Sequence, residues 1–224
     1  NIAFSYMSSS LTATIAGNFS LTGGIFNIKR DVGVATLTVN GTFNESGGTL
    51  YMHNNSSTAS SDVITMNIDG STFTESGGTI NFDNNTSSTS TDVLNINSSS
   101  IAYSGSSSIT HATSSYFGII NYIYGGTVNF SRAGAANIQQ AKQYINSGVT
   151  IVPSSNIQVA SSSTSANHDL LRVMNGATIS LGAYQIYSNG TLSNSSVQID
   201  AGGTLTTANT NGLYDGTTSA AISS

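Results

Sequence analysis

Short bursts of alternating apolar and polar residues run along most of the chain. Apolar residues two positions apart lie on one face of a β-strand, because successive side chains point to opposite sides. Such pairs recur at Ala13/Ile15, Leu37/Val39, Leu50/Met52, Met66/Ile68, Ile80/Phe82, Leu94/Ile96, Val149/Ile151, Ile157/Val159, Leu171/Val173, Ile179/Leu181 and Val197/Ile199. Asn-Gly, Asp-Gly and Gly-Gly pieces between them supply corners. The pattern predicts many short, half-buried strands.

The bursts belong to a repeat. The segment Val39-Asn-Gly-Thr-Phe-Asn-Glu-Ser-Gly-Gly-Thr-Leu50 recurs, with one extra residue, at 68–80, and an earlier copy with Phe19 lies twenty-four residues before the first. Members of four pairs are thirty residues apart: Phe43/Phe73, Glu45/Glu75, Gly47/Gly77 and Asp62/Asp92. A shorter cassette, Gly-Gly-Thr followed by apolar, polar and apolar residues, is found at 23–28, 47–52, 77–82 and 125–130, and more loosely at 176–181 and 202–207. Repetition at this period indicates stacked units.

A unit of 24–30 residues with several short strands and corners corresponds to one coil of a parallel β-helix. Each coil leaves its edges unpaired until a neighbour stacks on it, which explains the repetition. We therefore expect an all-β, right-handed parallel β-helix (β-solenoid) of about eight or nine coils, right-handed because parallel crossovers prefer that hand. The chain is interpreted as one solenoid segment, 1–224, of a longer polypeptide, with regular repeats at 1–104, irregular coils at 105–145 and diverged repeats at 146–224.

Composition changes this interpretation little and excludes some functions. Only 7% of the residues are charged and 38% are hydrophobic, which argues against disorder. There is no cysteine, and no apolar stretch is long enough for a membrane span. A net charge of −5 makes nucleic acid an improbable partner, and the adjacent pair Lys29 and Arg30 is interpreted as a solvated turn. Since no signal peptide precedes Asn1, we expect a mature N-terminus or an excised piece.

Two regions depart from the regular pattern. Residues 53–62 and 83–92 are corresponding Asn/Ser/Thr-rich insertions, which we expect to project on one side and to stack on each other. Residues 135–145 have a helix-forming composition, with Ile138, Ala141 and Ile145 at helical spacing. Extended structure is preferred there, for the reason given by the resemblance below.

Three segments follow one another in the second half: Asn146-Ser-Gly-Val-Thr-Ile-Val-Pro-Ser-Ser-Asn-Ile-Gln-Val159, then Met174-Asn-Gly-Ala-Thr-Ile-Ser-Leu-Gly-Ala-Tyr-Gln-Ile186, then Asp200-Ala-Gly-Gly-Thr-Leu-Thr-Thr-Ala-Asn-Thr-Asn-Gly-Leu213. This succession resembles the repeat regions of large surface and secreted proteins exported by the type 9 secretion system, adhesins among them. The N-terminal copy at 17–24 fits the same family. The resemblance implies a parallel β-helix, export across the outer membrane, and a strand at 137–145. It also implies a C-terminal sorting domain, which is not visible in this chain, and no catalytic residue carries over.

The only glutamates, Glu45 and Glu75, occupy the same repeat position. On adjacent coils they would stack about 5 Å apart, which is near the carboxylate separation of a retaining glycosidase. Any repeated residue stacks at this spacing, however, and no basic or aromatic cluster accompanies them. A solvated corner is the preferred interpretation, ahead of a shared cation such as Ca²⁺ and of catalysis.

The remaining residues give no enzyme signature. His53, His111 and His168 lie in separate loop-like stretches without metal-ligand spacing, and we expect them at the surface. No nucleophile elbow is present, and five scattered Lys and Arg residues are too few for a polyuronate lyase. We expect no enzyme activity and no cofactor, with Ca²⁺ as the one cation considered.

Two surface features are considered for binding. In the segment 119–124, Ile120, Tyr122 and Tyr124 share one face and Ile119 and Ile123 the other. If one face lines the core, the other forms a surface binding patch, with the tyrosines able to stack on a sugar or another chain. A covering loop is the equal alternative. Outward threonines at 12, 14, 36 and 38 begin a ladder like that of an ice-binding face, but it decays to Thr65/Asn67 and Asn95, so ice binding is disfavoured.

These observations predict a structural and adhesive function. The expected protein is a rigid stalk or display module of an exported bacterial surface protein, secreted or held at the cell surface. Its expected partners are the secretion machinery or other surface proteins of the same cell, and carbohydrate bound weakly along its side. The alternative is a carbohydrate-active β-helix, a polysaccharide hydrolase or lyase, whose cleft lies in loops that the sequence does not assemble.

Overall fold

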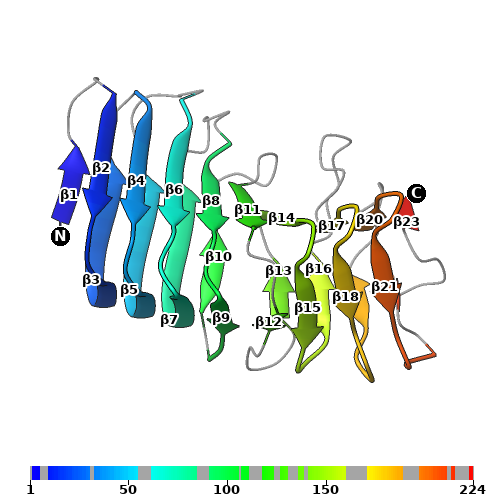
Figure 1. The fold of residues 1–224 in the computed structure, drawn as a ribbon. Coiled ribbons are helices and arrows are strands. Elements are labelled where there is room, and N and C mark those ends of the chain that lie inside the picture. Colours follow the sequence, from blue (N-terminus) through cyan, green and yellow to red (C-terminus); the bar gives the residue numbers. More distant parts are fainter. Residues whose placement is uncertain are drawn as a thin grey trace.

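A computed structural model gives the fold. It describes residues 2–5, 10–30, 33–54, 62–84, 91–105, 107–110, 118–123, 127–130, 136–138, 141–159, 171–188, 197–210, 213–214 and 222–223. Within these ranges the chain forms strands, turns and bends, and no helix, so none of them holds a helix that could span a membrane. Figure 1 shows the strands side by side in one stack that runs from the N-terminal to the C-terminal end.

The strands form three sheets over these residues. Sheet A consists, in spatial order, of β1 (Ile2–Ser5), β3 (Phe19–Lys29), β5 (Phe43–His53), β7 (Thr72–Asp83), β9 (Ser100–Tyr103), β12 (Thr127–Phe130), β15 (Thr150–Pro153), β18 (Thr178–Ser180) and β21 (Thr204–Thr206), with β10 (Ser108–Thr110) also paired to β7. Sheet B consists of β2 (Leu11–Ile15), β4 (Ala35–Val39), β6 (Ile64–Ile68), β8 (Val93–Ile96), β11 (Gly118–Tyr122), β14 (Ala141–Ile145), β17 (Leu171–Val173), β20 (Val197–Ile199) and β23 (Ile222–Ser223). Sheet C consists of β13 (Ala136–Ile138), β16 (Ile157–Val159), β19 (Ile186–Ser188) and β22 (Leu213–Tyr214).

Apart from β9 and β10, which both belong to sheet A, strands that follow each other in the chain lie in different sheets, and they pair in parallel with strands of the neighbouring coil. Thus β4 pairs with β6 while β5, between them in sequence, pairs with β7. The protein is therefore an all-β parallel β-solenoid, as the repeat predicts. Leu50 pairs with Ile80 in register, and Leu50, Met52, Ile80 and Phe82 are fully buried, which confirms the expected inward face and parallel pairing of this cassette.

The Gly-Gly corner lies inside long strands. β3, β5 and β7 continue through it, and the register shifts on both sides of it. The second glycine has a positive φ in each coil, 74° at Gly24, 88° at Gly48 and 95° at Gly78, a region that other L-residues rarely adopt. The cassette therefore encodes a bend that repeats at the same place in successive coils (Figure 1).

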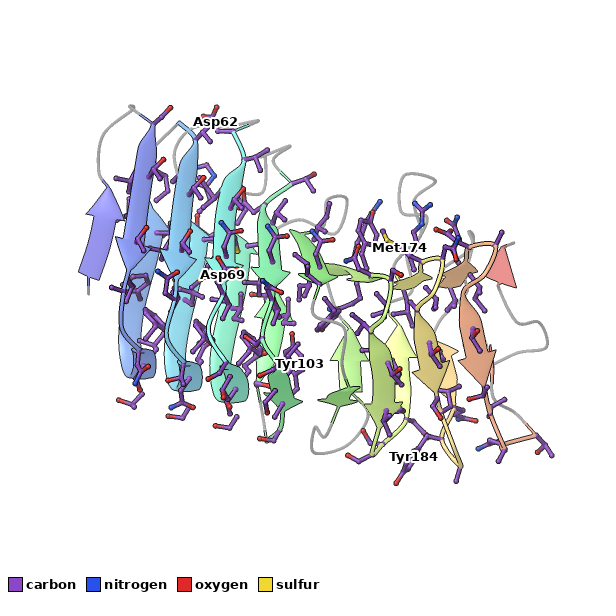
Figure 2. The ribbon with its side chains drawn as sticks, in the orientation of Figure 1. Asp62, Asp69, Tyr103, Met174 and Tyr184 are labelled. Carbon is purple, nitrogen blue, oxygen red and sulfur yellow. The ribbon has the colours of Figure 1, made fainter. Side chains whose placement is uncertain are left out.

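One continuous core runs between the sheets from Phe19 to Val197. Aromatic rings form a column in it: Phe19 and Phe43 stack with centroids 5.1 Å apart, and Phe43 and Phe73 with centroids 4.9 Å apart. Tyr103 follows at 5.3 Å from Phe73. In Figure 2 the labelled Tyr103 lies near the place where the long N-terminal strands give way to the shorter C-terminal ones.

The structure describes part of the two regions that depart from the regular sequence pattern. Residues 136–138 and 141–145 are the strands β13 and β14, which confirms extended structure over helix, while 139–140 lie outside the described residues. Most of the insertions 53–62 and 83–92 also lies outside. At their bases, Asn54 donates to Asn27 at 2.5 Å and Asn84 donates to Asn54, so the first residues of the insertions do stack as expected.

Candidate functional site

Three buried side chains that can bind a metal ion meet where two strands of sheet A end and one strand of sheet B begins. His53 is the last residue of β5, Asp83 is the last residue of β7, and the two are paired in register. Asp92 directly precedes β8. His53 Nδ1 lies 3.5 Å from Asp83 Oδ2, and one ligand atom from each of the three residues lies within 4.8 Å of the other two. We call His53, Asp83 and Asp92 the corner cluster.

The environment of Asp92 is unusual for a carboxylate. Its side chain is fully buried, and Oδ1 accepts a hydrogen bond of 2.8 Å from the backbone N–H of Ile64. Its second oxygen, Oδ2, has no hydrogen-bond partner. Burial raises the pKa of Asp92 well above its usual range, the Ile64 N–H and His53 oppose the rise, and Asp83 adds to it. One oxygen of Asp92 is thus held in place by the backbone, while the other is buried without a hydrogen-bond partner, which is costly for a carboxylate.

The corner cluster corrects the prediction that His53 lies at the surface, because His53 is fully buried. Lys29 pairs with His53 on the side away from Asp83 and is also fully buried, so the predicted solvated turn is wrong for Lys29, although Arg30 is exposed. Strand alternation predicts burial for the core face only. At the ends of these strands the other face is buried too, since neighbouring Asn27 is also completely shielded from solvent.

The predicted stack of Glu45 and Glu75 is present, but it does not form a solvated corner. The two residues pair in register on adjacent strands and both are fully buried. Glu45 Oε1 packs under the Gly-Gly bend of the next coil, because a Cβ at Gly78 would lie 2.8 Å from it. Burial, and then the charge of Glu75, raise the pKa of Glu45 to about 8, while the backbone N–H groups of Thr79 and Leu50 lower it.

The carboxyl group of Glu45 therefore lies near backbone donors. Such N–H groups favour the ionised form of that carboxyl group. The Ca²⁺ alternative at this pair stays a prediction. A pair of buried carboxyls without access to solvent also gives a polysaccharide no path to them. The pair is best described as an internal part of the bend.

The segment 119–124 does not present the predicted patch. Ile120 and Tyr122 are fully buried, so the face that they share lines the core, and Tyr124 lies outside the described residues. The Tyr122 hydroxyl can donate its one proton either to the Tyr103 hydroxyl, at 3.0 Å, or to Gln143 Oε1, at 2.5 Å. These buried partners explain how a phenol is accommodated at an inward position. On the other face, Ile123 is 44% exposed and Ile119 is half-buried.

The outer face of sheet B carries a ladder of polar side chains, as the alternation predicts. The Asn121 side chain donates to Asn95 at 2.8 Å, Asn95 donates to Asn67 at 2.9 Å, and Asn67 donates to Thr38 at 3.4 Å. These four residues, from β4, β6, β8 and β11, are called the amide ladder. Each member uses part of its hydrogen-bonding capacity on its neighbours and remains partly exposed. Such a face can offer amide and hydroxyl groups to a polar ligand along several coils.

His111 and His168 lie outside the described residues, so their predicted surface positions stay predictions.

One feature of the sequence did indicate part of the corner cluster. His53 and Asp83 directly follow the cassettes 47–52 and 77–82, and so occupy one repeat position thirty residues apart. In comparison with known proteins, no family model, no curated protein and no solved structure matches the chain.

Proposed function

We propose that this protein is a structural and adhesive module, a rigid stalk or display segment of an exported bacterial surface protein. The observation that carries the proposal is the single core that runs through the stack, enclosed by strands that each pair with a neighbouring coil. Bending such a stack requires ladder hydrogen bonds and core contacts to break together. A stalk needs this property, since it must hold a distal part at a fixed distance.

The finer architecture belongs to the same proposal. Nine strands of sheet B, each following the last by one repeat, support about eight or nine coils. With coils spaced about 4.8 Å apart the stack is roughly 40 Å long. Right-handed coiling is proposed on the general preference of parallel crossovers. Export, location at the cell surface and relation to type 9 secretion rest on the sequence resemblance.

The amide ladder is the proposed adhesive surface. Its partly exposed amide and hydroxyl groups can hydrogen-bond the hydroxyl groups of a polysaccharide that lies along the stack. Each contact is weak in water, because it replaces a hydrogen bond with solvent. Binding therefore depends on several coils acting together, which suits weak attachment along the side of a stalk.

The stalk proposal is tested by changing the number of coils. Phe43 and Phe73 are in register on adjacent strands, so removal of residues 44–73 joins Phe43 to Thr74 and deletes one coil without changing the inward face. Insertion of a second copy of 44–73 adds one coil. The longest dimension measured by small-angle X-ray scattering is expected to change by about 4.8 Å per coil, with circular dichroism unchanged.

Removal of 44–58 alone, half a repeat, is the control and is expected to disrupt folding. Loss of folding in both whole-coil variants would contradict the stalk proposal.

The proposed adhesive surface is tested separately. Binding of the chain to immobilised bacterial and plant polysaccharides is measured for the wild type and for Asn95→Ala, and binding that the substitution leaves unchanged would exclude the amide ladder.

A further inference from the structure

The corner cluster has no role in the stalk as described so far, and burying it is costly. A histidine and two carboxylates are taken out of water. A buried carboxylate oxygen without a hydrogen bond is strongly unfavourable, because the interior gives it nothing in place of water. Asp92 Oδ2 is such an oxygen, and it lies beside two further ligand-type side chains.

We propose that the corner cluster is a structural binding site for one divalent first-row transition ion, Zn²⁺ being the best match. The ligands would be one ring nitrogen of His53, one oxygen of Asp83 and Asp92 Oδ2. The ion would join the ends of β5 and β7 to the beginning of β8, and so fasten neighbouring coils at the side of the stack where the insertions leave.

The geometry supports this ligand set. With metal–ligand distances of about 2.0–2.2 Å, two ligands of a tetrahedral ion lie about 3.4 Å apart. The separation of His53 Nδ1 and Asp83 Oδ2 is 3.5 Å, and no pair in the cluster exceeds 4.8 Å. No pair of ligand atoms therefore exceeds the tetrahedral spacing by more than about 1.4 Å.

The orientation of Asp92 supports it as well. Carboxylate ligands in metal sites are commonly held by a hydrogen bond to their other oxygen. In the corner cluster the N–H of Ile64 holds Asp92 Oδ1 at 2.8 Å and leaves Oδ2 without a hydrogen-bond partner.

The chemistry of the ligands selects the class of ion. Imidazole nitrogen suits Zn²⁺ and its transition-metal neighbours, whereas Ca²⁺ takes six to eight oxygen ligands and Mg²⁺ keeps most of its water. Two carboxylates and a neutral imidazole balance a charge of +2. Lys29, which is fully buried and paired in register with His53, is the basic side chain on the coil next to the cluster.

Metal content and stability of the whole chain test the proposal. The protein is unfolded in urea with a chelator and refolded with or without Zn²⁺, because buried ligands are most accessible during folding. One tightly bound equivalent is expected by elemental analysis after dialysis, with a melting temperature about 5 °C or more above that of the metal-free form. Ca²⁺ and Mg²⁺ at the same concentration are expected to give no shift.

Two variants locate the ion. Asp92→Asn keeps the size of the side chain and an acceptor for Ile64 N–H, and His53→Gln keeps a polar group; each is expected to weaken Zn²⁺ binding by at least about tenfold. Asp69→Asn, an exposed carboxylate on the same stack, is the matched control and should bind as the wild type does. In the metal-free form Asp92→Asn should be at least as stable as the wild type, which separates loss of a ligand from loss of folding.

Binding of Co²⁺ to the wild-type chain is a further test, and it does not require that any variant folds. In the wild-type chain it is expected to produce the visible absorption of a low-symmetry site with a nitrogen ligand. Absence of stoichiometric Zn²⁺ in the refolded wild type would overturn the proposal and leave the cluster as a buried ion network with Lys29. Undiminished binding in both variants, or an equal response to Ca²⁺, would also overturn it.

Discussion

Glu75 lies directly on Glu45 in the adjacent strand, paired in register, and both side chains are completely shielded from solvent. Two ionised carboxylates cannot be held this way at low cost, because burial and mutual repulsion both favour the protonated form. A proton retained on Glu45, whose pKa is raised to about 8, resolves the conflict. This relationship makes the stability of the fold depend on pH.

The pH dependence has a definite sign. The pKa of Glu45 is about 8 in the folded chain and near 4.5 when unfolded, so between these values the folded form keeps a proton that the unfolded form has released. The free energy of unfolding is therefore expected to fall as pH rises from about 4.5 to about 8, by up to about 1.4 kcal/mol per pH unit from this pair. Urea unfolding at several pH values measures the slope.

Glu45→Gln removes the titrating group and is expected to make that slope shallower, leaving the part due to Asp92, whose pKa is raised as well. Asp69→Asn is the control, since Asp69 is exposed and should leave the slope as it is. Identical slopes in Glu45→Gln and the wild type would show that Glu45 is ionised throughout.

The aromatic column predicts a large difference between the two faces of a strand. Phe73→Asp would put a carboxylate between the stacked ring of Phe43 and that of Tyr103, at a cost of several kcal/mol. Thr38→Asp, on the outer face, leaves the charge near water and within reach of the Asn67 amide, so it should cost no more than about 0.5 kcal/mol. Thermal unfolding compares them, and equal tolerance would mean that the inward face is not a packed core.

Close approach of backbones predicts a similar contrast between two glycines. A Cβ at Gly70 would lie 1.7 Å from the carbonyl oxygen of Gly41 in the neighbouring coil, whereas a Cβ at Gly23 meets nothing within 4 Å. Gly70→Ala must therefore push two coils apart and is expected to destabilise the chain by several kcal/mol. Gly23→Ala should change stability by less than about 1 kcal/mol. The two melting temperatures test this, and an unchanged value for Gly70→Ala would contradict the close approach.

The amide ladder predicts that stability depends on the hydrogen bond that the Asn95 side chain donates. Asn95→Asp can still accept from Asn121 but can no longer donate to Asn67, and it places a charge beside the Asn67 oxygen. A loss of about 1 kcal/mol in the free energy of unfolding is expected. Thr12→Asp on the same face, where the side chain is exposed, is the control and should cost less. Equal losses in urea unfolding would show that the ladder contributes nothing specific.

Periodicity predicted the general fold because a repeated inward doublet can be satisfied only by stacking. The pairing of Leu50 with Ile80 and the burial of Phe73 follow from alternation and repetition. The extended structure of 136–138 and 141–145 was expected from the resemblance instead, since the spacing there is helical. Repetition also predicted that Glu45 and Glu75 stack, since residues one repeat apart meet on adjacent coils.

Alternation misled wherever burial was not confined to one face. By alternation, His53 and Lys29 belong to the outward face of their strands, and yet both are fully buried. Glu45 belongs to the inward face, but it lies in a bend that the sequence made look like a surface corner. The segment that holds Ile120 and Tyr122 is equally apolar on both faces of the strand, so the sequence could not show which face is buried. The choice depended on Tyr103 and Gln143, distant residues that satisfy the Tyr122 hydroxyl.

The sequence by itself determined that this protein is a stack of parallel coils with a continuous core, because its period and its inward doublets are local properties that repeat. It also determined which residues share a position in successive coils. Only the tertiary structure decided that Asp92 joins His53 and Asp83. Asp92 precedes a strand of sheet B while the other two end strands of sheet A, and their meeting depends on how the chain passes from one sheet to the other. In sheet B, Thr65 pairs with Val93, twenty-eight residues later, although Asp62 and Asp92 are thirty residues apart. Asp92 accepts a hydrogen bond from the N–H of Ile64 and is fully buried, whereas Asp62 accepts one from the N–H of Gly33 and is half-buried.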